Sequence, residues 1–229
     1  MIELLIAILE TLFAWLLLSL AFTGMGAVLQ KLLRRKITPD SFFDSFWIGF
    51  CFTLFFLNIW HFFFPTSPFA LALILVAGIS GIAIAANEIK ATFKNFKWDK
   101  KLNCPAIFLI VLAFLMADRT MGKILEMDTG YFGLPITEWY HHYRVIPGLA
   151  NLQACLAFNQ STFLLNGLLE GCPHFLPGAR ATNGVFILIL IAKFLLDFYK
   201  TSENAISGRR KYFQGILLVY LLIESLGIW

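Results

Sequence analysis

Six long apolar stretches dominate this chain of 229 residues and constrain its fold more than any other feature. Hydrophobic residues make up 59% of the sequence and charged residues only 14%, whereas soluble domains carry about 25% charged residues. Because a helix needs roughly 20 apolar residues to cross a bilayer, the length accommodates about six spans. We therefore expect an all-α, polytopic transmembrane helical bundle. The composition excludes an ordinary soluble domain, a disordered chain and a nucleic-acid binder.

The expected spans follow from where the apolar runs begin and end. They cover about residues 4–29, 42–64, 69–89, 102–117, 184–199 and 213–229. The turn Pro65-Thr66-Ser67-Pro68 is short, so the second and third spans should form a hairpin. The whole chain, 1–229, is expected to be one membrane domain. Since the chain stops with its sixth span at Trp229, we expect either a piece of a longer protein or an end anchored by an interfacial tryptophan.

The basic residues predict the orientation of these spans. Of the 18 lysines and arginines, 14 lie in or beside three short connections, within 31–36, 90–101 and 193–211. Alternation of the spans puts these connections on one side, and the positive-inside rule makes that side cytoplasmic. The N-terminus and the long loop at 119–183 are then outside. We expect a multi-pass protein of a cell inner membrane.

Several polar residues fall within or near the spans. Lys193 and Asp197 are four residues apart on one helix face, so they can pair and neutralise each other. The run Thr23-Gly24-Met25-Gly26 is typical of close helix packing. Four other residues could form a proton or ion path, or could instead reflect packing and interfacial positions. They are Glu10, Asp44, His61 and Glu224.

The loop at 119–183 carries the candidate chemistry. It is too aromatic to be disordered, and a connection this long is uncommon unless it is functional. Pro135 at a helix start, with Glu138 in the first turn, predicts a short helix that ends by Pro147-Gly148. A second helix is predicted over 161–169, with Ser161 as its N-cap. Both should lie in the membrane interface. The residues expected near one face of the first helix are Phe132, Ile136, Trp139, Tyr140 and Tyr143.

Part of this loop resembles a known family. The residues that carry the resemblance are Asp128-Thr129-Gly130-Tyr131, Trp139, Tyr143, Pro147-Gly148-Leu149-Ala150-Asn151-Leu152 and Phe158-Asn159-Gln160-Ser161. This pattern is similar to the outer loop of a bacterial family of polytopic membrane proteins. That family looks like a branch of the GT-C-type glycosyltransferases, which are multi-span enzymes that use polyprenyl-phosphate-linked sugars.

The resemblance implies an enzyme that transfers sugar in cell-envelope glycan synthesis. The acidic residue at the matching position is Asp128, whose carboxylate would accept the proton of an acceptor hydroxyl that attacks the anomeric carbon. The leaving group would be a lipid phosphate, which positive or hydrogen-bonding groups must hold. Asp128 could instead satisfy its own turn, and each histidine could be an interfacial packing residue. The candidate substrate-binding residues are Arg144, His141, His142, Lys123, Glu138, Trp139 and Asn151.

The expected partners are membrane lipids, a lipid-phosphate-linked sugar donor and a glycan or lipid acceptor. We expect no cofactor, no metal and no nucleic acid. The chain departs from the family pattern at Gln153 and Cys155, where a histidine and an arginine would be expected. It could therefore be a truncated or inactive relative. A non-catalytic multi-span membrane subunit and a relative of a transporter or envelope-polymer ligase are the alternative interpretations.

The four cysteines fall into two groups. Cys155 and Cys172 lie in the outer loop, where they could form a disulfide or stay free. Cys51 lies in a span and Cys104 at a cytoplasmic edge, so both are expected to be free.

Overall fold

The chain is helical wherever its structure is described. The computed structural model describes residues 2–33, 39–95, 102–120, 132–152, 161–170, 182–203 and 215–220. Every regular element within these residues is a helix, as the all-α prediction required. Within the described residues, three helices are long and apolar enough to cross a membrane, and they cover Ile2–Leu32, Ser41–His61 and Asn103–Thr120. These helices indicate a membrane protein, while the number of six spans stays a prediction.

The chain divides into two compact units. Unit 1 comprises Met1–Lys97 and Met121–Thr182, and unit 2 comprises Trp98–Thr120 and Asn183–Trp229. The prediction of a single membrane domain over 1–229 stays a prediction.

Unit 2 contains α5 (Asn103–Thr120), nearly all of α9 (Thr182–Glu203) and a helical segment at 215–220. Helix α5 covers the fourth expected span and α9 the fifth. In α9, Lys193 Nζ lies 2.8 Å from Asp197 Oδ1, so the predicted ion pair is confirmed.

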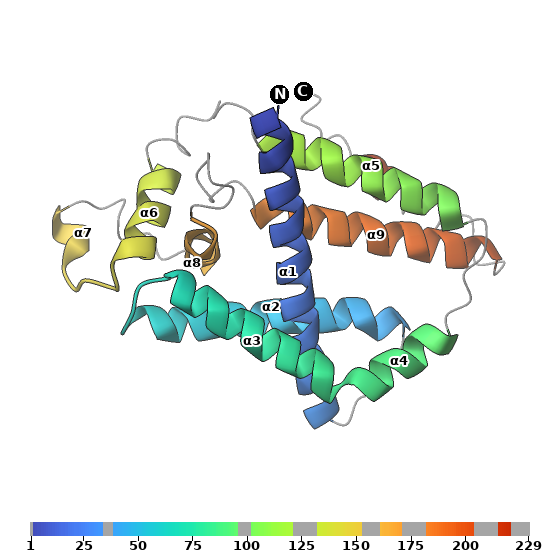
Figure 1. The fold of residues 1–229 in the computed structure, drawn as a ribbon, viewed down its shortest axis with the longest axis horizontal. Coiled ribbons are helices and arrows are strands. Elements are labelled where there is room, and N and C mark those ends of the chain that lie inside the picture. The colour runs from blue at the N-terminus through green and yellow to red at the C-terminus, as the bar shows by residue number, and fades with distance from the viewer. Residues whose placement is uncertain are drawn as a thin grey trace. The chain divides into compact units, whose positions relative to one another are not determined.

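Helix α1 (Ile2–Leu32) is the centre of unit 1. With 31 residues it is about 46 Å long, more than the roughly 30 Å of a bilayer's hydrocarbon core. It crosses and packs on both α2 (Pro39–His61) and α3 (Pro68–Ile84) (Figure 1). Phe22 and Leu18 are buried in this packing. Large apolar side chains of α1 that face outward, such as Phe13, suit contact with lipid.

Glycines bring these three helices into backbone contact. A methyl group at Gly26 would overlap the carbonyl oxygen of Ser45 in α2. A methyl group at Gly24 would overlap the carbonyl oxygen of Gly78 in α3. The predicted close packing at Thr23–Gly26 is therefore confirmed, and only residues without a side chain allow helix axes to approach this closely.

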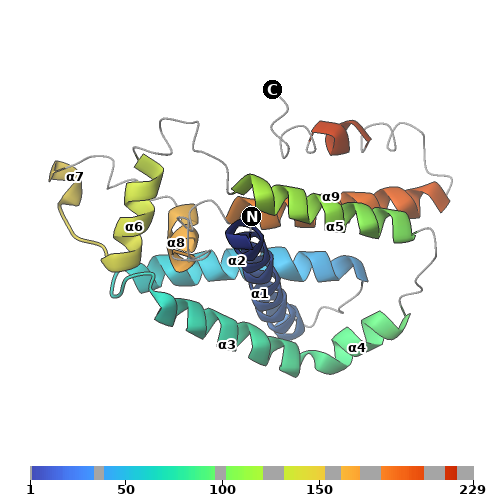
Figure 2. The same ribbon diagram turned by 45° about the horizontal axis from the view of Figure 1, so that its top comes forward.

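A short turn at 62–67 joins α2 to α3, as the sequence predicted, and both helices pack mainly on α1 rather than on each other (Figure 2). Helix α2 ends at His61, three residues before the predicted end, because the residues before Pro65 leave the helical conformation. The indole N–H of Trp60 donates to the carbonyl oxygen of Pro65 at 2.9 Å and closes this turn. Helix α3 begins at Pro68, where a missing backbone N–H is tolerated.

The third expected span, 69–89, is interrupted. Helix α3 ends at Ile84, and Ala85 has φ −95° and ψ 11°, outside the helical range. Helix α4 (Ala86–Asn95) then continues in another direction (Figures 1 and 2). The apolar helix therefore ends about five residues before the predicted end of this span. The following residues form a separate amphipathic helix.

The described parts of the long loop form three short helices in unit 1, and they are α6 (Leu134–His142), α7 (Leu149–Leu152) and α8 (Ser161–Leu168). Helix α6 has Pro135 in its first turn, but Glu138 falls one turn later than expected and the helix ends before Pro147. Helix α8 spans nearly the predicted residues. Ser161 is its first helical residue, and its hydroxyl accepts a hydrogen bond from Asn58 Nδ2 at 3.0 Å. The position of these helices in a membrane interface stays a prediction.

Candidate functional site

The candidate site lies where the loop helices meet the turn of the α2–α3 hairpin. Thr66 in this turn donates twice to the carbonyl oxygen of Tyr140, from its backbone N–H at 2.9 Å and from its hydroxyl at 2.8 Å. The N–H of Val145 donates to the carbonyl oxygen of His61 at 3.0 Å. Three hydrogen bonds therefore attach α6 and the segment after it to the end of α2 and the turn that follows.

Helix α6 buries a narrower face than the sequence indicated. Ile136, Thr137 and Tyr140 are buried, whereas Phe132 is 43% and Tyr143 51% exposed. The reason is the packing against α8, where Gly167 leaves room for Thr137 and Thr66. A β-carbon at Gly167 would lie 2.5 Å from Thr66 Oγ1, so the close approach of these elements requires glycine.

The candidate residues are distributed unevenly over this site. Glu138, His142, Arg144 and Asn151 are exposed, while Trp139 and His141 are half-buried. Lys123 and the proposed catalytic residue Asp128 lie outside the described residues. The described candidates therefore lie on α6, on the segment after it and, for Asn151, in α7.

His141 is the most firmly positioned of these residues. Its Nδ1 lies 2.7 Å from the carbonyl oxygen of Gly167. Because a carbonyl oxygen only accepts hydrogen bonds, this contact places the proton of a neutral ring on Nδ1 and leaves Nε2 as a base. The ring of His142 stands edge-on to it, with centroids 5.0 Å apart. The two rings offer nitrogens that can form hydrogen bonds with a ligand.

Aromatic rings adjoin the two histidines. The rings of Trp139 and Tyr143 are 4.5 Å apart and tilted by 35°. Trp139 Nε1 is buried and has no hydrogen-bond partner among the described residues. Rings of this kind offer apolar faces with a polar edge, which suits both lipid chains and sugar rings.

Two further residues belong to this site: Thr66 was not predicted as functional, and His61 was named only as a candidate for a proton or ion path. His61 is only 4% exposed, and its ring centroid lies 4.5 Å from that of Tyr140. Neither ring nitrogen has a hydrogen-bond partner of normal geometry among the described residues, although the Phe64 backbone lies nearby. Burial raises the pKa of the Tyr140 hydroxyl. The alternation of membrane spans could have indicated these residues, because it predicts that the turn after α2 and the long loop lie on the same side of the membrane.

Metal and disulfide chemistry have little basis in the described part of the chain. No group of three or more His, Cys, Asp or Glu side chains among the described residues could hold a metal ion. Cys51 and Cys104 are free, as expected. Cys155 and Cys172 lie outside the described residues, so the alternative of a disulfide stays open.

Comparison with known proteins gives one family. A family described as a domain of unknown function (DUF8201) matches residues 8–227, which include the hairpin, the loop helices and every candidate residue. The chain belongs to the DUF8201 family. Neither a curated protein nor a solved structure matches it. The DUF8201 match therefore fixes the extent of the family domain.

Proposed function

We propose that this DUF8201 member is a membrane-embedded, GT-C-like glycosyltransferase that uses a polyprenyl-phosphate-linked sugar in cell-envelope glycan synthesis. The observation that carries the proposal is the attachment of α6 to the hairpin turn through Thr66 and Tyr140. It holds His141, His142 and Arg144 at the end of two apolar helices. A lipid phosphate would arrive at such a position from the bilayer.

The reaction needs a base, and we assign this role to Asp128 on the resemblance of the loop motif. The acceptor oxygen forms a bond to the anomeric carbon, and the bond from that carbon to the phosphate oxygen breaks. The acceptor proton passes to the Asp128 carboxylate, and the electron pair leaves with the polyprenyl phosphate. The step requires no metal and no redox cofactor.

The leaving phosphate needs cations or hydrogen-bond donors. Arg144 is exposed two residues beyond α6 and presents a permanently charged guanidinium. His142 is exposed beside His141 and supplies a second donor. Charge-assisted hydrogen bonds of this kind are about twice as strong as neutral ones. Trp139 and Tyr143 then provide the apolar surface on which a sugar or the first lipid unit rests.

We also propose the location that this function requires. The site is placed on the outer face of a cell inner membrane, with the N-terminus on the same side. The positive-inside rule supports this orientation, because the basic connections lie in other segments. A polyprenyl-linked donor and an envelope acceptor would meet there.

The test is an assay of the full chain in nanodiscs with radiolabelled polyprenyl-phosphate sugars and membrane acceptors. The wild type should release polyprenyl phosphate, and Asp128→Asn should lower the rate by at least about 100-fold, as expected for removal of a general base. Asp118→Asn, which changes an exposed acid at the end of α5, should leave it unchanged.

Two outcomes of this assay would contradict the proposal. Equal rates for Asp128→Asn and the wild type would remove the catalytic role. The absence of product with every donor would leave the non-catalytic membrane subunit as the better interpretation.

His141→Phe should also lower the rate, since it removes the nitrogen that Gly167 positions while keeping a ring of similar size.

A further inference from the structure

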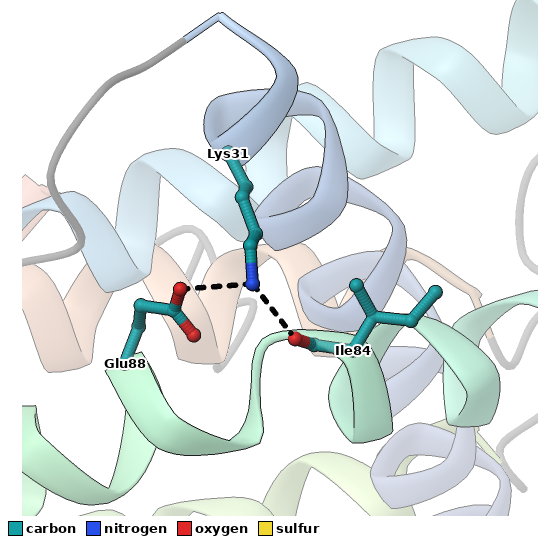
Figure 3. Close-up of polar contacts among 3 residues, drawn as sticks. All are labelled: Lys31, Ile84 and Glu88. Atoms are coloured by element: carbon teal, nitrogen blue, oxygen red, sulfur yellow. Dashed lines mark hydrogen bonds and ion pairs between the residues drawn. The ribbon is translucent and has the colours of Figure 1, made fainter.

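The end of unit 1 opposite the hairpin turn carries a polar clip that no part of the proposed reaction uses. Lys31 Nζ lies 2.9 Å from Glu88 Oε1 and donates to the carbonyl oxygen of Ile84 at 3.1 Å (Figure 3). Lys31 belongs to the last turn of α1, Ile84 is the last residue of α3, and Glu88 lies in the first turn of α4. One ammonium group therefore joins three helices.

The clip acts on the junction between α3 and α4. The last carbonyl groups of a helix lack intrahelical partners and carry partial negative charge, so a cation stabilises them. Lys31 supplies that cation to α3 and at the same time binds the carboxylate of Glu88. Helix α4 leaves the axis of α3 at Ala85 (Figures 1 and 2), and the Lys31 contacts connect both helices to α1 on either side of this break.

Helix α4 is amphipathic and basic. Lys90 and Lys94 are exposed and four residues apart, so they lie on one face of the helix. Ile89 is partly buried on another face, beside the junction with α3. Lys31, Lys90 and Lys94 therefore give the described part of this region three basic side chains.

The neighbouring helices indicate where α4 lies. Helices α1 and α3 are apolar and end together at the clip, so this end of unit 1 is where the hydrocarbon gives way to polar surroundings. A ten-residue helix with lysines along one face cannot cross the bilayer. Connected to α3 at an angle, it is suited to lie along the surface in which α3 ends.

We propose that α4 is a binding surface for anionic phospholipid headgroups of the same bilayer, with Lys90 and Lys94 as the headgroup contacts and Lys31 as the residue that orients the helix. Charge complementarity supports this occupant, since clusters of lysine and arginine beside a span attract anionic lipids. The position of α4 in the chain supports this occupant as well, because α4 directly follows the apolar helix α3. This surface is independent of the proposed sugar transfer.

The test measures lipid selectivity of the full chain, reconstituted in phosphatidylcholine bilayers. Electron spin resonance of spin-labelled phosphatidylglycerol and phosphatidylcholine gives the relative association of each lipid with the protein. The wild type should prefer phosphatidylglycerol. Lys90→Gln with Lys94→Gln should lower this preference roughly threefold to tenfold, whereas Lys90→Arg with Lys94→Arg should keep it.

The second part of the test measures the same lipid preference at higher ionic strength. Raising the salt concentration from 0.1 M to 1 M shortens the screening length from about 10 Å to about 3 Å, so the preference of the wild type should fall toward that of the double glutamine variant. An unchanged preference in the glutamine variant would overturn the proposal and favour a protein partner for α4. A wild-type preference that persists at 1 M salt would overturn it too.

Discussion

Thr66 and Tyr140 are 74 positions apart in the sequence, and the carbonyl oxygen of Tyr140 accepts hydrogen bonds from both the N–H and the hydroxyl of Thr66. This pair connects the turn of an apolar hairpin to a helix of the long loop. At the other end of unit 1, Lys31 connects the end of α1 to the start of α4. The alternation of spans predicts that the turn holding Thr66 and the loop holding Tyr140 lie on one side of the membrane. It predicts that the connections beside Lys31 and Glu88 lie together on the other side.

The first prediction concerns the hydroxyl of Thr66, which is fully buried. Thr66→Val should lower the free energy of unfolding by about 1 kcal/mol, because the backbone N–H still satisfies the Tyr140 carbonyl while the hydroxyl bond is lost. Thermal unfolding in detergent micelles measures the effect. Thr66→Ser keeps the hydroxyl and should retain most of the stability, and a Val variant as stable as the wild type would show that the bond contributes nothing.

The second prediction concerns the glycine contacts of α1. Gly26→Ala should lower the free energy of unfolding by about 1–3 kcal/mol or more, because the new methyl group overlaps the backbone of Ser45 and pushes α1 away from α2. Gly215→Ala is the control, since no other described residue lies within 4 Å of a β-carbon at that position. The control should be neutral or slightly stabilising. Equal effects at both positions would contradict close packing as the role of Gly26.

The third prediction concerns pH. The hydrogen bond from the Lys31 ammonium lowers the pKa of the Glu88 carboxyl. A carboxyl with a lowered pKa in the folded state stabilises the fold above its ordinary value of about 4.3, and the contribution is lost as the pH falls through the lowered value. A fluorophore at Ala91→Cys, in a variant without other cysteines, should therefore report greater motion of α4 as the pH falls from 6 toward 3.

Glu88→Gln is the control for this titration. Without the carboxylate, the motion of α4 at pH 6 should already match that of the parent at low pH, and the curve should be flat. If the glutamine variant titrated like the parent, another acid would be responsible.

Much of the helical arrangement could be predicted because it depends on composition and spacing. The apolar runs predicted α1, α2 and α5, and the four-residue spacing predicted the bond between Lys193 and Asp197. The break at Ala85 could not be predicted, since no glycine or proline marks it and the stabilising cation comes from Lys31, more than fifty residues earlier.

The candidate site was harder to predict for a similar reason. Helical spacing groups residues on a face but does not say what covers that face, so Phe132 and Tyr143 were grouped with Tyr140 although only Tyr140 is buried. His61 and Thr66 join the site through tertiary contacts with α6. Asp128, on which the proposed chemistry depends, was chosen by resemblance and lies outside the described residues.

The account rests most of all on the two ends of unit 1 facing opposite sides of the membrane, with the histidines of α6 outside. The direct measurement is labelling of single cysteines in intact cells with a membrane-impermeant maleimide, in a chain lacking its four native cysteines. Glu138→Cys in α6 should react in intact cells, and Asn87→Cys in α4 should react only after the membrane is permeabilised. Reaction of Asn87→Cys in intact cells, with Glu138→Cys protected, would contradict the orientation and with it the proposed site of sugar transfer.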